Sequence, residues 1–476
     1  MKSARHFAGS NFQKPVDNSS FPQVRGNSKR ESAWHFLLAL LIAAPLAAAQ
    51  EPLTPEHPTS ALPAEAQSQP LPAAPAPEPD RPLTLAECYA LALKRSEDIA
   101  IQTELIKQTE AQFLQALSGV LPRASYEVSK KRQDGTGSSA FTLRDTPERR
   151  FAFSQPLFGG FKEFAAMAGS RAERRQRLHE RRRAEDLLFV DVANAFYLIL
   201  EQQEDLRALA AIRGTLVERI DELKQREQLG RSRTTDAVSA EAQLRRVEAE
   251  MEQARTQEVT ARKLLEFLTG LSRVQAVTDP APSLLPADAE SAYVARAAAR
   301  PDVQAAEDAW RVAQKEVTIA RAGFFPDVDL EGNYYTRRVG NAASVEWDVT
   351  LLMSVPIFQG GQNLGAVREA RSSERQAKLT FERRQRQAAL DVQDAYAAYT
   401  GALARHAALA RALEATEQSY RLQVDDYRLA LVNNLDVLQT LQTLEDSRRE
   451  TLHAGYEAKR LSWQLEAAAG NIAPPW

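Results

Sequence analysis

The sequence predicts a mixed fold that is mainly α-helical with a smaller membrane β part, arranged as two tandem structural repeats. The first observation is a duplication, in which about 115 residues recur at a constant spacing of 200 without a gap. The second is heptad spacing of apolar residues along stretches of almost 70 residues that lack proline. The third is apolar–polar alternation in segments of about ten residues, which is typical of half-buried strands.

Composition excludes several classes of protein. The chain has 476 residues, of which 44% are hydrophobic and 26% charged, and its net charge is −3. It is too polar for a bundle of membrane helices, too apolar for a disordered chain, and too weakly charged for a typical nucleic-acid-binding protein. The single cysteine, Cys88, excludes an intramolecular disulfide and a multi-cysteine metal site. We find no enzyme signature and expect no catalytic residue, cofactor or metal.

The N-terminal region has the pattern of a secretory signal peptide followed by a tether. A basic segment precedes an apolar run over 36–49 that ends in alanines, so we expect a signal peptide over 1–49 with cleavage after Ala49. A peripheral membrane anchor is the alternative. Residues 50–82 are rich in proline and alanine, which predicts a disordered tether, or less favourably a segment recognised by a partner.

The two repeats share a set of matched positions. Pro156-Leu157-Phe158 and Gly160 recur as Pro356-Ile357-Phe358 and Gly360. Upstream the spacing is 204, because the Gly119 to Pro122 segment matches the Gly323 to Pro326 segment. We place the difference of four in a loop between strands.

These matches set the expected boundaries: repeat 1 over 83–270, a linker over 271–287, repeat 2 over 288–470 and a tail over 471–476. Each repeat begins with two short helices, which proline ends. For repeat 1 we then expect strands at about 123–133 and 146–156, a long helix over 159–229, a tip at 230–235 and a helix over 236–270. For repeat 2 the expected elements are strands at about 327–337 and 344–356, a long helix over 360–430, a tip at 431–435 and a helix over 436–470.

The strands have the length of a tilted membrane crossing. Apolar residues such as Trp347 and Met353 alternate with polar ones, although a soluble sheet with one hydrated face is the alternative. The polar face carries carboxylates that would line a barrel lumen, either as a negative field or as ordinary hydrated lining: Glu127, Asp329, Glu331, Glu346 and Asp348.

The helices are too long for an ordinary globular core. About 69 residues at 1.5 Å each make a rod of roughly 100 Å, which indicates that the rods bridge a distance. Glycine, serine, threonine and asparagine at 230–236 and 431–436 can end one helix and start the next. The rods therefore turn back as two antiparallel hairpins, with their tips far from the strands.

Four membrane strands cannot close a barrel, and open sheet edges are not tolerated in lipid, so chains must associate. Two chains would give 8 strands around a filled interior, and three would give 12 strands around a lumen.

The duplicated motifs resemble the TolC-type outer-membrane efflux proteins over about 83–470. The resemblance implies a homotrimer in the outer membrane of a Gram-negative cell, with a 12-strand β-barrel continued by a 12-helix α-barrel in the periplasm. It also implies an exit duct of a tripartite efflux or type I secretion system, which conducts substrates passively. The implied partners are further copies of the chain, a periplasmic adaptor (a membrane fusion protein), an RND, ABC or MFS pump of the inner membrane, and outer-membrane lipid, but no nucleic acid.

By the same resemblance, the hairpin tips carry the functional residues. A periplasmic gate is expected at Asp236, Tyr427, Asp436 and Gln439. Adaptor contacts are expected at the tips: Gly230, Arg231, Ser232, Thr234, Thr235, Ala430, Leu431, Asn433 and Asn434. Val432 occupies a place where some relatives carry a base, which predicts a gate with few charged ties. Capping of the returning helices is an alternative role for Asp236 and Asp436.

Two other functions remain open at this point, a periplasmic adaptor and a coiled-coil scaffold. An adaptor would have one helical hairpin flanked by β-domains, whereas this chain has two hairpins. A scaffold would not need strands with Trp347 and Met353 on an outer face. The cargo, whether drug, metal ion or protein, is not encoded in these features.

Overall fold

The computed structural model describes residues 81–134, 143–230, 232–280, 284, 286–429, 431–470 and 472. The predicted signal peptide, all but the end of the tether, and most of the tail lie outside the described residues. Two predicted tip residues, Arg231 and Ala430, lie outside them as well.

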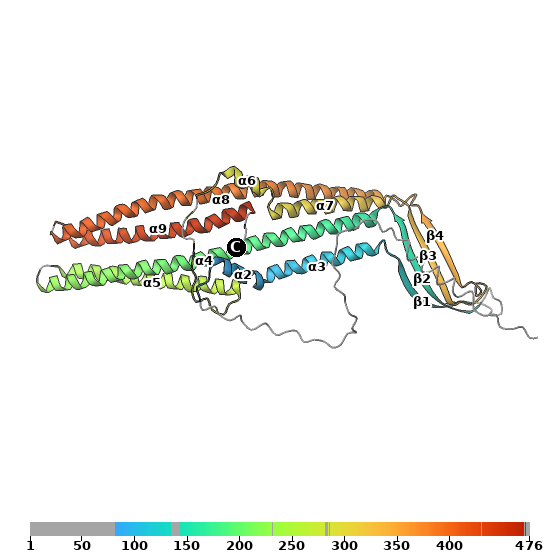
Figure 1. Ribbon diagram of the computed structural model, residues 1–476, viewed down its shortest axis with the longest axis horizontal. Helices are drawn as coiled ribbons and strands as arrows, with labels where there is room; N and C mark the ends of the chain where they lie inside the picture. Colours follow the sequence, from blue (N-terminus) through green and yellow to red (C-terminus); the bar gives the residue numbers. More distant parts are fainter. Residues whose placement is uncertain are drawn as a thin grey trace, which may run out of the picture. The chain divides into compact units, whose positions relative to one another are not determined.

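The described elements of the first repeat are six. They are α2 (Leu85–Arg95), α3 (Glu97–Ser118), β1 (Arg123–Arg132), β2 (Asp145–Gly159), α4 (Lys162–Gln228) and α5 (Thr234–Thr269). The long helix α4 and its return helix α5 lie side by side and lead away from the strands (Figure 1).

The second repeat follows the same order. Its elements are α6 (Glu290–Ala297), α7 (Pro301–Ala322), β3 (Asp327–Arg337), β4 (Trp347–Ser354), α8 (Gln362–Arg428) and α9 (Asn434–Ala469). Helices α4 and α8 are both 67 residues long, and α5 and α9 are both 36 residues long. The first residues of α4 and α8 are 200 positions apart, and so are those of α5 and α9. The first residues of α3 and α7, which have 22 residues each, are 204 positions apart. The predicted mixed fold of two repeats is confirmed.

Some boundaries differ from the expected ones for local reasons. Helix α4 begins at Lys162 rather than 159, because Gly160 and Phe161 both adopt a left-handed backbone, with φ values of 66° and 67°. Helices α5 and α9 begin two residues before Asp236 and Asp436, since each aspartate is the third residue of its helix and caps from there. Strand β4 is shorter than 344–356, because a turn occupies the residues before Glu346.

The four strands form one antiparallel sheet in the order β1-β2-β3-β4, so β1 and β4 are its edges. Directly paired residues share a face of the sheet. One face carries the row Tyr126, Phe151, Tyr334 and Trp347, which are paired in succession across the four strands. The other face carries polar side chains at the alternate positions. The sheet is therefore amphipathic, as the alternation predicts.

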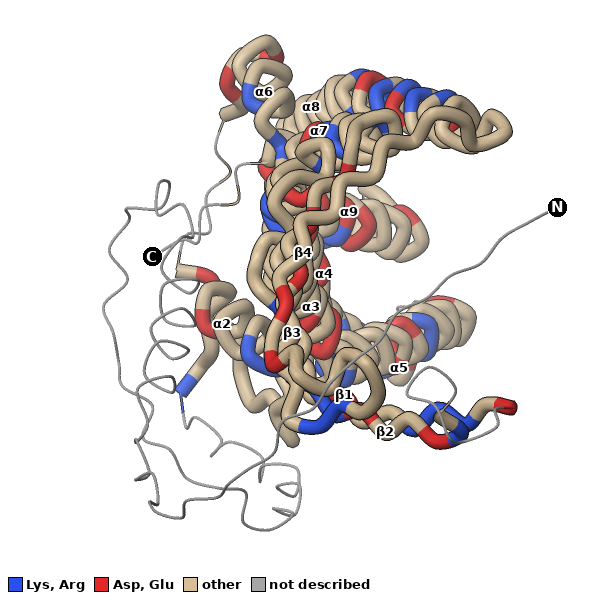
Figure 2. The backbone as a smooth tube through the Cα atoms, turned by 90° about the vertical axis from the view of Figure 1, so that its right-hand side faces the viewer, with Lys and Arg blue, Asp and Glu red and all other residues tan. Residues whose placement is uncertain are grey.

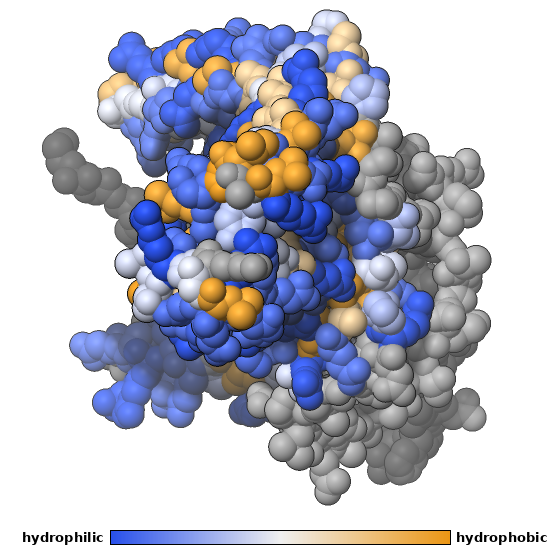
Figure 3. All heavy atoms as spheres, turned by 90° about the vertical axis from the view of Figure 1, so that its left-hand side faces the viewer, coloured by the Kyte–Doolittle hydropathy of each residue, from blue (hydrophilic) through white to orange (hydrophobic). Residues whose placement is uncertain are grey.

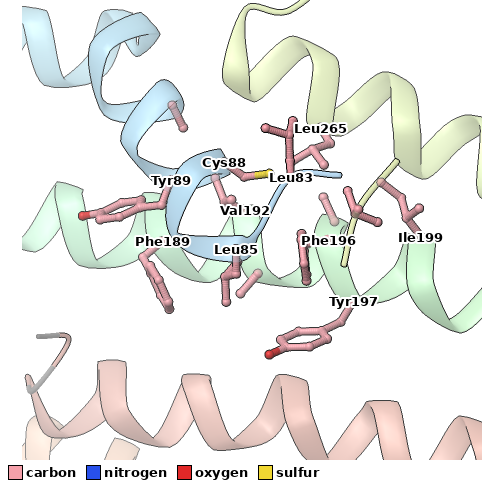
Figure 4. Close-up of a cluster of buried hydrophobic side chains, with 14 of the residues drawn as sticks. Leu83, Leu85, Cys88, Tyr89, Phe189, Val192, Phe196, Tyr197, Ile199 and Leu265 are labelled. Atoms are coloured by element: carbon pink, nitrogen blue, oxygen red, sulfur yellow. The ribbon is translucent and has the colours of Figure 1, made fainter. Parts of the chain in front are cut away.

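The largest apolar core lies beside the short helix α2. Cys88 and Phe189 are fully buried there, and Figure 4 shows α2 side chains directed at α4, with Leu265 of α5 alongside. The edge of the Tyr89 ring meets Phe189 at 5.0 Å between centroids. Burial raises the pKa of the Cys88 thiol to about 12, so this cysteine is a packing residue rather than a reactive one.

The long helices carry charges of both signs along their length, which Figure 2 shows as alternating colours on α8 and α5. Many of these charges pair within one helix, such as Arg181 with Glu185 at 3.0 Å. Within the described residues, no helix is long and apolar enough to cross a membrane.

The buried Arg300, which precedes α7, joins this helix to the two helices of the second hairpin, α8 and α9. Arg300 is 2% exposed and contacts Asp302 at 2.6 Å and Asp391 at 2.9 Å. It also donates a hydrogen bond to the carbonyl of Ala468 at 3.2 Å. Burial opposes charge on Asp302, yet the Arg300 bonds hold the pKa of Asp302 below its ordinary value.

We expect Arg300→Met to lower the free energy of unfolding by about 3–5 kcal/mol, because two carboxylates lose their buried partner. The stabilisation from Asp302 is present above its ordinary pKa and is lost as the pH falls through the lowered one. The difference from wild type should therefore shrink under acid conditions. Chemical denaturation at neutral and acid pH measures both effects. The exposed control Arg411→Met should change little, and a loss no larger than that of this control would contradict the prediction.

Candidate functional site

At both hairpin tips an aspartate in the third position of the returning helix caps the start of that helix, and only the second tip has the full reciprocal capping box. The Asp236 carboxylate accepts hydrogen bonds from the Ser232 hydroxyl at 3.1 Å and the Arg233 N–H at 3.3 Å. In the second tip, the Asp436 carboxylate accepts from the Asn433 N–H at 3.2 Å, and the Asn433 side-chain oxygen accepts from the Asp436 N–H at 3.1 Å. Both predicted gate aspartates therefore cap their helices, and the capping role foreseen as an alternative is present.

An arginine that the sequence analysis did not single out ties the hairpins together. The guanidinium of Arg219, on α4, donates two hydrogen bonds to the side-chain oxygen of Asn434, at 3.1 and 3.0 Å. The same group lies 3.9 Å from the ring centroid of Tyr427, on α8. The Asn434 amide in turn donates to the carbonyl of Asp236 at 3.4 Å. Arg219 of α4 thus contacts α8 and α9 directly and reaches α5 through Asn434.

The other predicted gate residues occupy separate positions. Tyr427 contacts Arg219 and also Arg226, whose guanidinium lies 4.9 Å from the ring centroid. Gln439 is exposed on α9, and its carbonyl accepts a hydrogen bond from the Thr443 hydroxyl at 3.0 Å. Arg219 thus places one charged group between the hairpins of a single chain, while the prediction of a gate with few charged ties stays a prediction.

Most of the predicted adaptor-contact residues that the structure describes are exposed, whereas Ser232 is half-buried and Asn434 is buried. Thr234, Thr235 and Asn433 are exposed at the tips, and Gly230 turns the chain with a φ of 70°. Asn434 is 4% exposed and held by Arg219, so it lies behind the exposed tip residues, and its contact with an adaptor stays a prediction.

Four exposed leucines form the apolar part of the surface of the tips. Leu429 and Leu431 are 70% and 71% exposed, and Leu229 and Leu435 are similarly exposed. Figure 3 views this end directly and shows two hydrophobic areas among hydrophilic neighbours. The leucine at the end of each long helix was visible as a repeated pair, Leu229 and Leu429. A bulky apolar residue repeated at two polar turns is the signal that could have identified this surface.

Farther from the tips, charged residues from α4, α5 and α9 meet between the hairpins. Arg449 pairs with the buried Asp205 at 2.7 Å and with Glu250 at 2.5 Å. Glu201 accepts hydrogen bonds from His453 and Arg460. Although burial raises the pKa of Glu201, these two partners hold it below its ordinary value. The hairpins of one chain are thus joined by ion pairs along their length as well as at the tips.

The sheet register brings the predicted lumen carboxylates of the strands onto one face. Glu127 lies opposite Arg150, and Arg150 lies opposite Tyr335. Asp348 accepts hydrogen bonds from Asn333 and Tyr335, at 2.9 and 2.8 Å.

On the same face Arg150 pairs with Glu127 at 2.7 Å, and Arg338 lies 3.5 Å from Glu148. These arginines reduce the negative charge at the end of the sheet far from the helices. Asp329 and Glu331 share this face nearer to α7, while Glu346 lies just before β4.

Among the described residues, no group of three or more His, Cys, Asp or Glu side chains could hold a metal ion. What the site offers is a polar sheet face, long helices with paired charges, and capped tips with exposed leucines.

Comparisons with known proteins agree with this arrangement. Residues 293–471 match the family model described as outer membrane efflux protein. The cation efflux system protein CusC of Escherichia coli O157:H7 is 25% identical over 398 residues, which cover 80% of this chain and 84% of CusC. The alkaline protease secretion protein AprF of Pseudomonas aeruginosa is 26% identical over 421 residues, which cover 82% of this chain and 85% of AprF.

Solved structures show the same fold. The outer membrane protein VceC of Vibrio cholerae superposes with a TM-score of 0.71 at 20% identity, covering 81% of this chain and 96% of VceC. A crystal structure of CusC gives a TM-score of 0.71 at 20% identity, covering 81% of this chain and 92% of that chain. The resemblance found in the duplicated motifs is confirmed, and the adaptor and scaffold alternatives are set aside.

Glu445 on α9 is buried at the junction between the hairpins. It is 4% exposed, and burial together with the nearby Glu250 raises its pKa to about 7, against the opposing influence of Arg449. Asp446 and Arg246 are the other charges close to it. The native state therefore binds a proton near neutral pH that the unfolded chain releases at lower pH.

We expect the thermal midpoint of the wild type to fall between pH 5 and pH 8, because the folded state must then ionise a buried carboxyl. Glu445→Gln should flatten this slope and be more stable than wild type at pH 8, by on the order of 2 kcal/mol. The exposed control Asp446→Asn should keep the wild-type slope. Thermal unfolding followed across this pH range decides the matter, and parallel curves for wild type and Glu445→Gln would show that Glu445 does not titrate there.

Proposed function

We propose that this chain, a TolC-type efflux channel of the outer membrane, is the exit duct of a tripartite efflux or type I secretion system. In this role it conducts substrates passively from an inner-membrane pump across the periplasm and the outer membrane. The observation that carries the proposal is the direct connection of an amphipathic, open-edged sheet to hairpins of roughly 100 Å.

The two free edges of the sheet support a trimer. Strands β1 and β4 are the edges, and a membrane sheet must close because lipid offers no hydrogen-bond partners. Three copies would contribute 12 strands and 12 long and return helices, in which the row from Tyr126 to Trp347 faces lipid. The polar face with Asp329 and Glu331 would line the lumen. Arg150 and Arg338 support a hydrated lining with mixed charge rather than a uniformly negative filter.

The tips support docking to a periplasmic adaptor of an RND, ABC or MFS pump. The exposed leucines at 229, 429, 431 and 435 offer apolar contacts, and Thr234, Thr235 and Asn433 offer polar ones. The relatives named for cation efflux and for protease secretion support a duct whose cargo is selected by its pump.

The periplasmic gate is proposed at the same tips, where three copies would bring Asp236, Asp436 and Gln439 into rings. Tyr427 belongs to this gate through Arg219, which holds the hairpins of one chain together. Opening would require the Arg219 contacts with Tyr427 and Asn434 to break or stretch.

The first test is planar-bilayer conductance of the purified protein, with its oligomeric mass from light scattering on the same sample. We expect a trimer that inserts and gives discrete conductance steps. A protein that stays monomeric or dimeric and never conducts would contradict the proposed duct.

The Arg219 tie predicts a change in gating. Arg219→Ala should raise the time-averaged single-channel current by about fivefold or more, because two charge-assisted hydrogen bonds and a cation–π contact that hold the closed tip are lost. Arg213→Ala, on the same helix, removes only an exposed pair with Glu248 and serves as the control. Equal currents for wild type and both variants would remove Arg219 from the gate.

A further inference from the structure

We propose that Arg375 of one protomer pairs with Glu104 of the next and that this pair fixes the register in which two copies meet. The partner is a second copy of this chain, and the inference rests on the proposed trimer. It adds the register in which neighbouring copies meet and the residues that fix it.

The template is the contact between repeats within one chain. There α4 packs against α7 and α9, and β2 pairs with β3. Helix α8 corresponds to α4 at a spacing of 200, α3 to α7 at 204, and α5 to α9 at 200. If copies follow one another as the repeats do, α8 of one protomer packs against α3 and α5 of the next, and β4 pairs with β1.

Exposure differs between corresponding residues as this arrangement requires. Ile101 on α3 is 55% exposed, whereas its counterpart Ala305 on α7 is 6% exposed. Phe267 on α5 is 77% exposed, while its counterpart Ala467 on α9 is 4% exposed. These apolar residues are uncovered in a single chain because the helix that would cover them belongs to another copy.

An ion pair marks the register. Within the chain, Arg175 of α4 pairs with Asp308 of α7 at 2.9 Å, and Arg311 pairs with the same carboxylate at 3.0 Å. The corresponding residues are Arg375, Glu104 and Lys107. The charges are retained at all three positions, although the acid changes from aspartate to glutamate.

Part of the charged cluster of Arg375, Glu104 and Lys107 is already present in the single chain. Lys107 pairs with Glu104 at 2.7 Å, as Arg311 does with Asp308. Glu104 and Arg375 are both exposed. Arg375 of a neighbouring copy would complete the cluster and bury Glu104, so that loss or reversal of one charge would leave the other buried without a partner.

A repeated glycine supports the same contact. Gly160 has a φ of 66°, and a Cβ there would lie 2.9 Å from the carbonyl oxygen of Ala322. Gly360 has a similar φ of 61°, but a Cβ there would meet nothing within 4 Å. Gly160 approaches the end of α7 closely. We expect Gly360 to approach the end of α3 in the next copy in the same way.

The correspondence fails where the hairpins of one chain are tied by charge. The counterparts of Arg219 and Asn434 are Ser419 and Thr234, which carry no charge. The counterparts of Arg449 and Asp205 are Ala249 and Arg405, which cannot form an ion pair. The surface between copies therefore lacks the counterparts of the Arg219 and Arg449 ties, and Arg375 with Glu104 lies on its better-matched part, nearer the sheet.

The first test is charge reversal in the full-length protein. Arg375→Glu and Glu104→Arg should each lower the trimer-to-monomer ratio in detergent by about tenfold or more, since like charges then face each other. The double variant should regain most of the ratio. Arg411→Glu makes the same charge change on α8 at a site whose counterpart, Ala211, is exposed, so it should leave the trimer unchanged.

The second test is a disulfide that also reports register. A Cβ on Gly169 of α4 would lie 3.6 Å from the Cβ of Lys315, which is a separation that disulfides accept. The corresponding pair between copies is Glu369 and Ala111. The double variant Glu369→Cys with Ala111→Cys should yield covalent dimers and trimers on oxidation. Pairing Glu369→Cys with Gln115→Cys, one helical turn away, should yield few.

The outcomes separate this inference from the proposed duct. A wild-type trimer in which Arg375→Glu is not rescued by Glu104→Arg, and in which the two cysteine pairs cross-link equally, would overturn the register while leaving the duct intact. A wild-type protein that is not a trimer would overturn both. Rescue together with selective cross-linking would support the register.

Discussion

A peptide group in lipid has no water to bond with, and this constraint governs the rest of the structure. Strands β1 and β4 end the sheet of one chain with unpaired edges, while its apolar face is suited to lipid. Stability in the membrane therefore requires other copies to supply the missing strands. The helices must follow the same closure, because α4 and α8 continue directly from β2 and β4 through short glycine-containing turns. The arrangement of the helices in a ring would therefore follow from the closure of the strands into a barrel.

Duplication is an economical way to meet this constraint. Two repeats give each chain two strand pairs and two hairpins of equal length, so that successive units around a ring are nearly equivalent. Equivalence is maintained where backbone geometry demands it, as at Gly160 and Gly360. It is lost where one contact lies within the chain and the other between chains, as at Arg219 and Ser419. At positions whose counterpart contact lies between chains, the sequence can change without disturbing the fold of one chain.

Much of the fold could be predicted because its signals are local. Helix length, strand alternation and the glycine and asparagine turns are all read along the chain, and the expected elements lie within a few residues of those observed. The ties between hairpins could not be predicted in this way. Arg219 lies more than 200 residues from its partners Tyr427 and Asn434, and on its own helix it looks like any solvated arginine. The burial of Glu445 was likewise hidden, because a glutamate on a charged rod is ordinarily exposed.

In the proposed duct, the positions of the ion pairs and hydrogen bonds between helices indicate which contact separates more easily. The hairpins of one chain are joined by Arg219 near the tip and by Arg449 and Arg460 farther along, with partners that are largely buried. Breaking such a pair leaves an uncompensated buried charge, which costs several kcal/mol. In the proposed arrangement of copies, Ser419 would lie opposite Thr234 and Ala249 opposite Arg405, so separation there would expose no buried ion pair. In the proposed duct, separation therefore costs less between chains than between the hairpins of one chain. The Arg219 contacts are thus the larger obstacle when the tips open, which is why their loss is expected to raise the current.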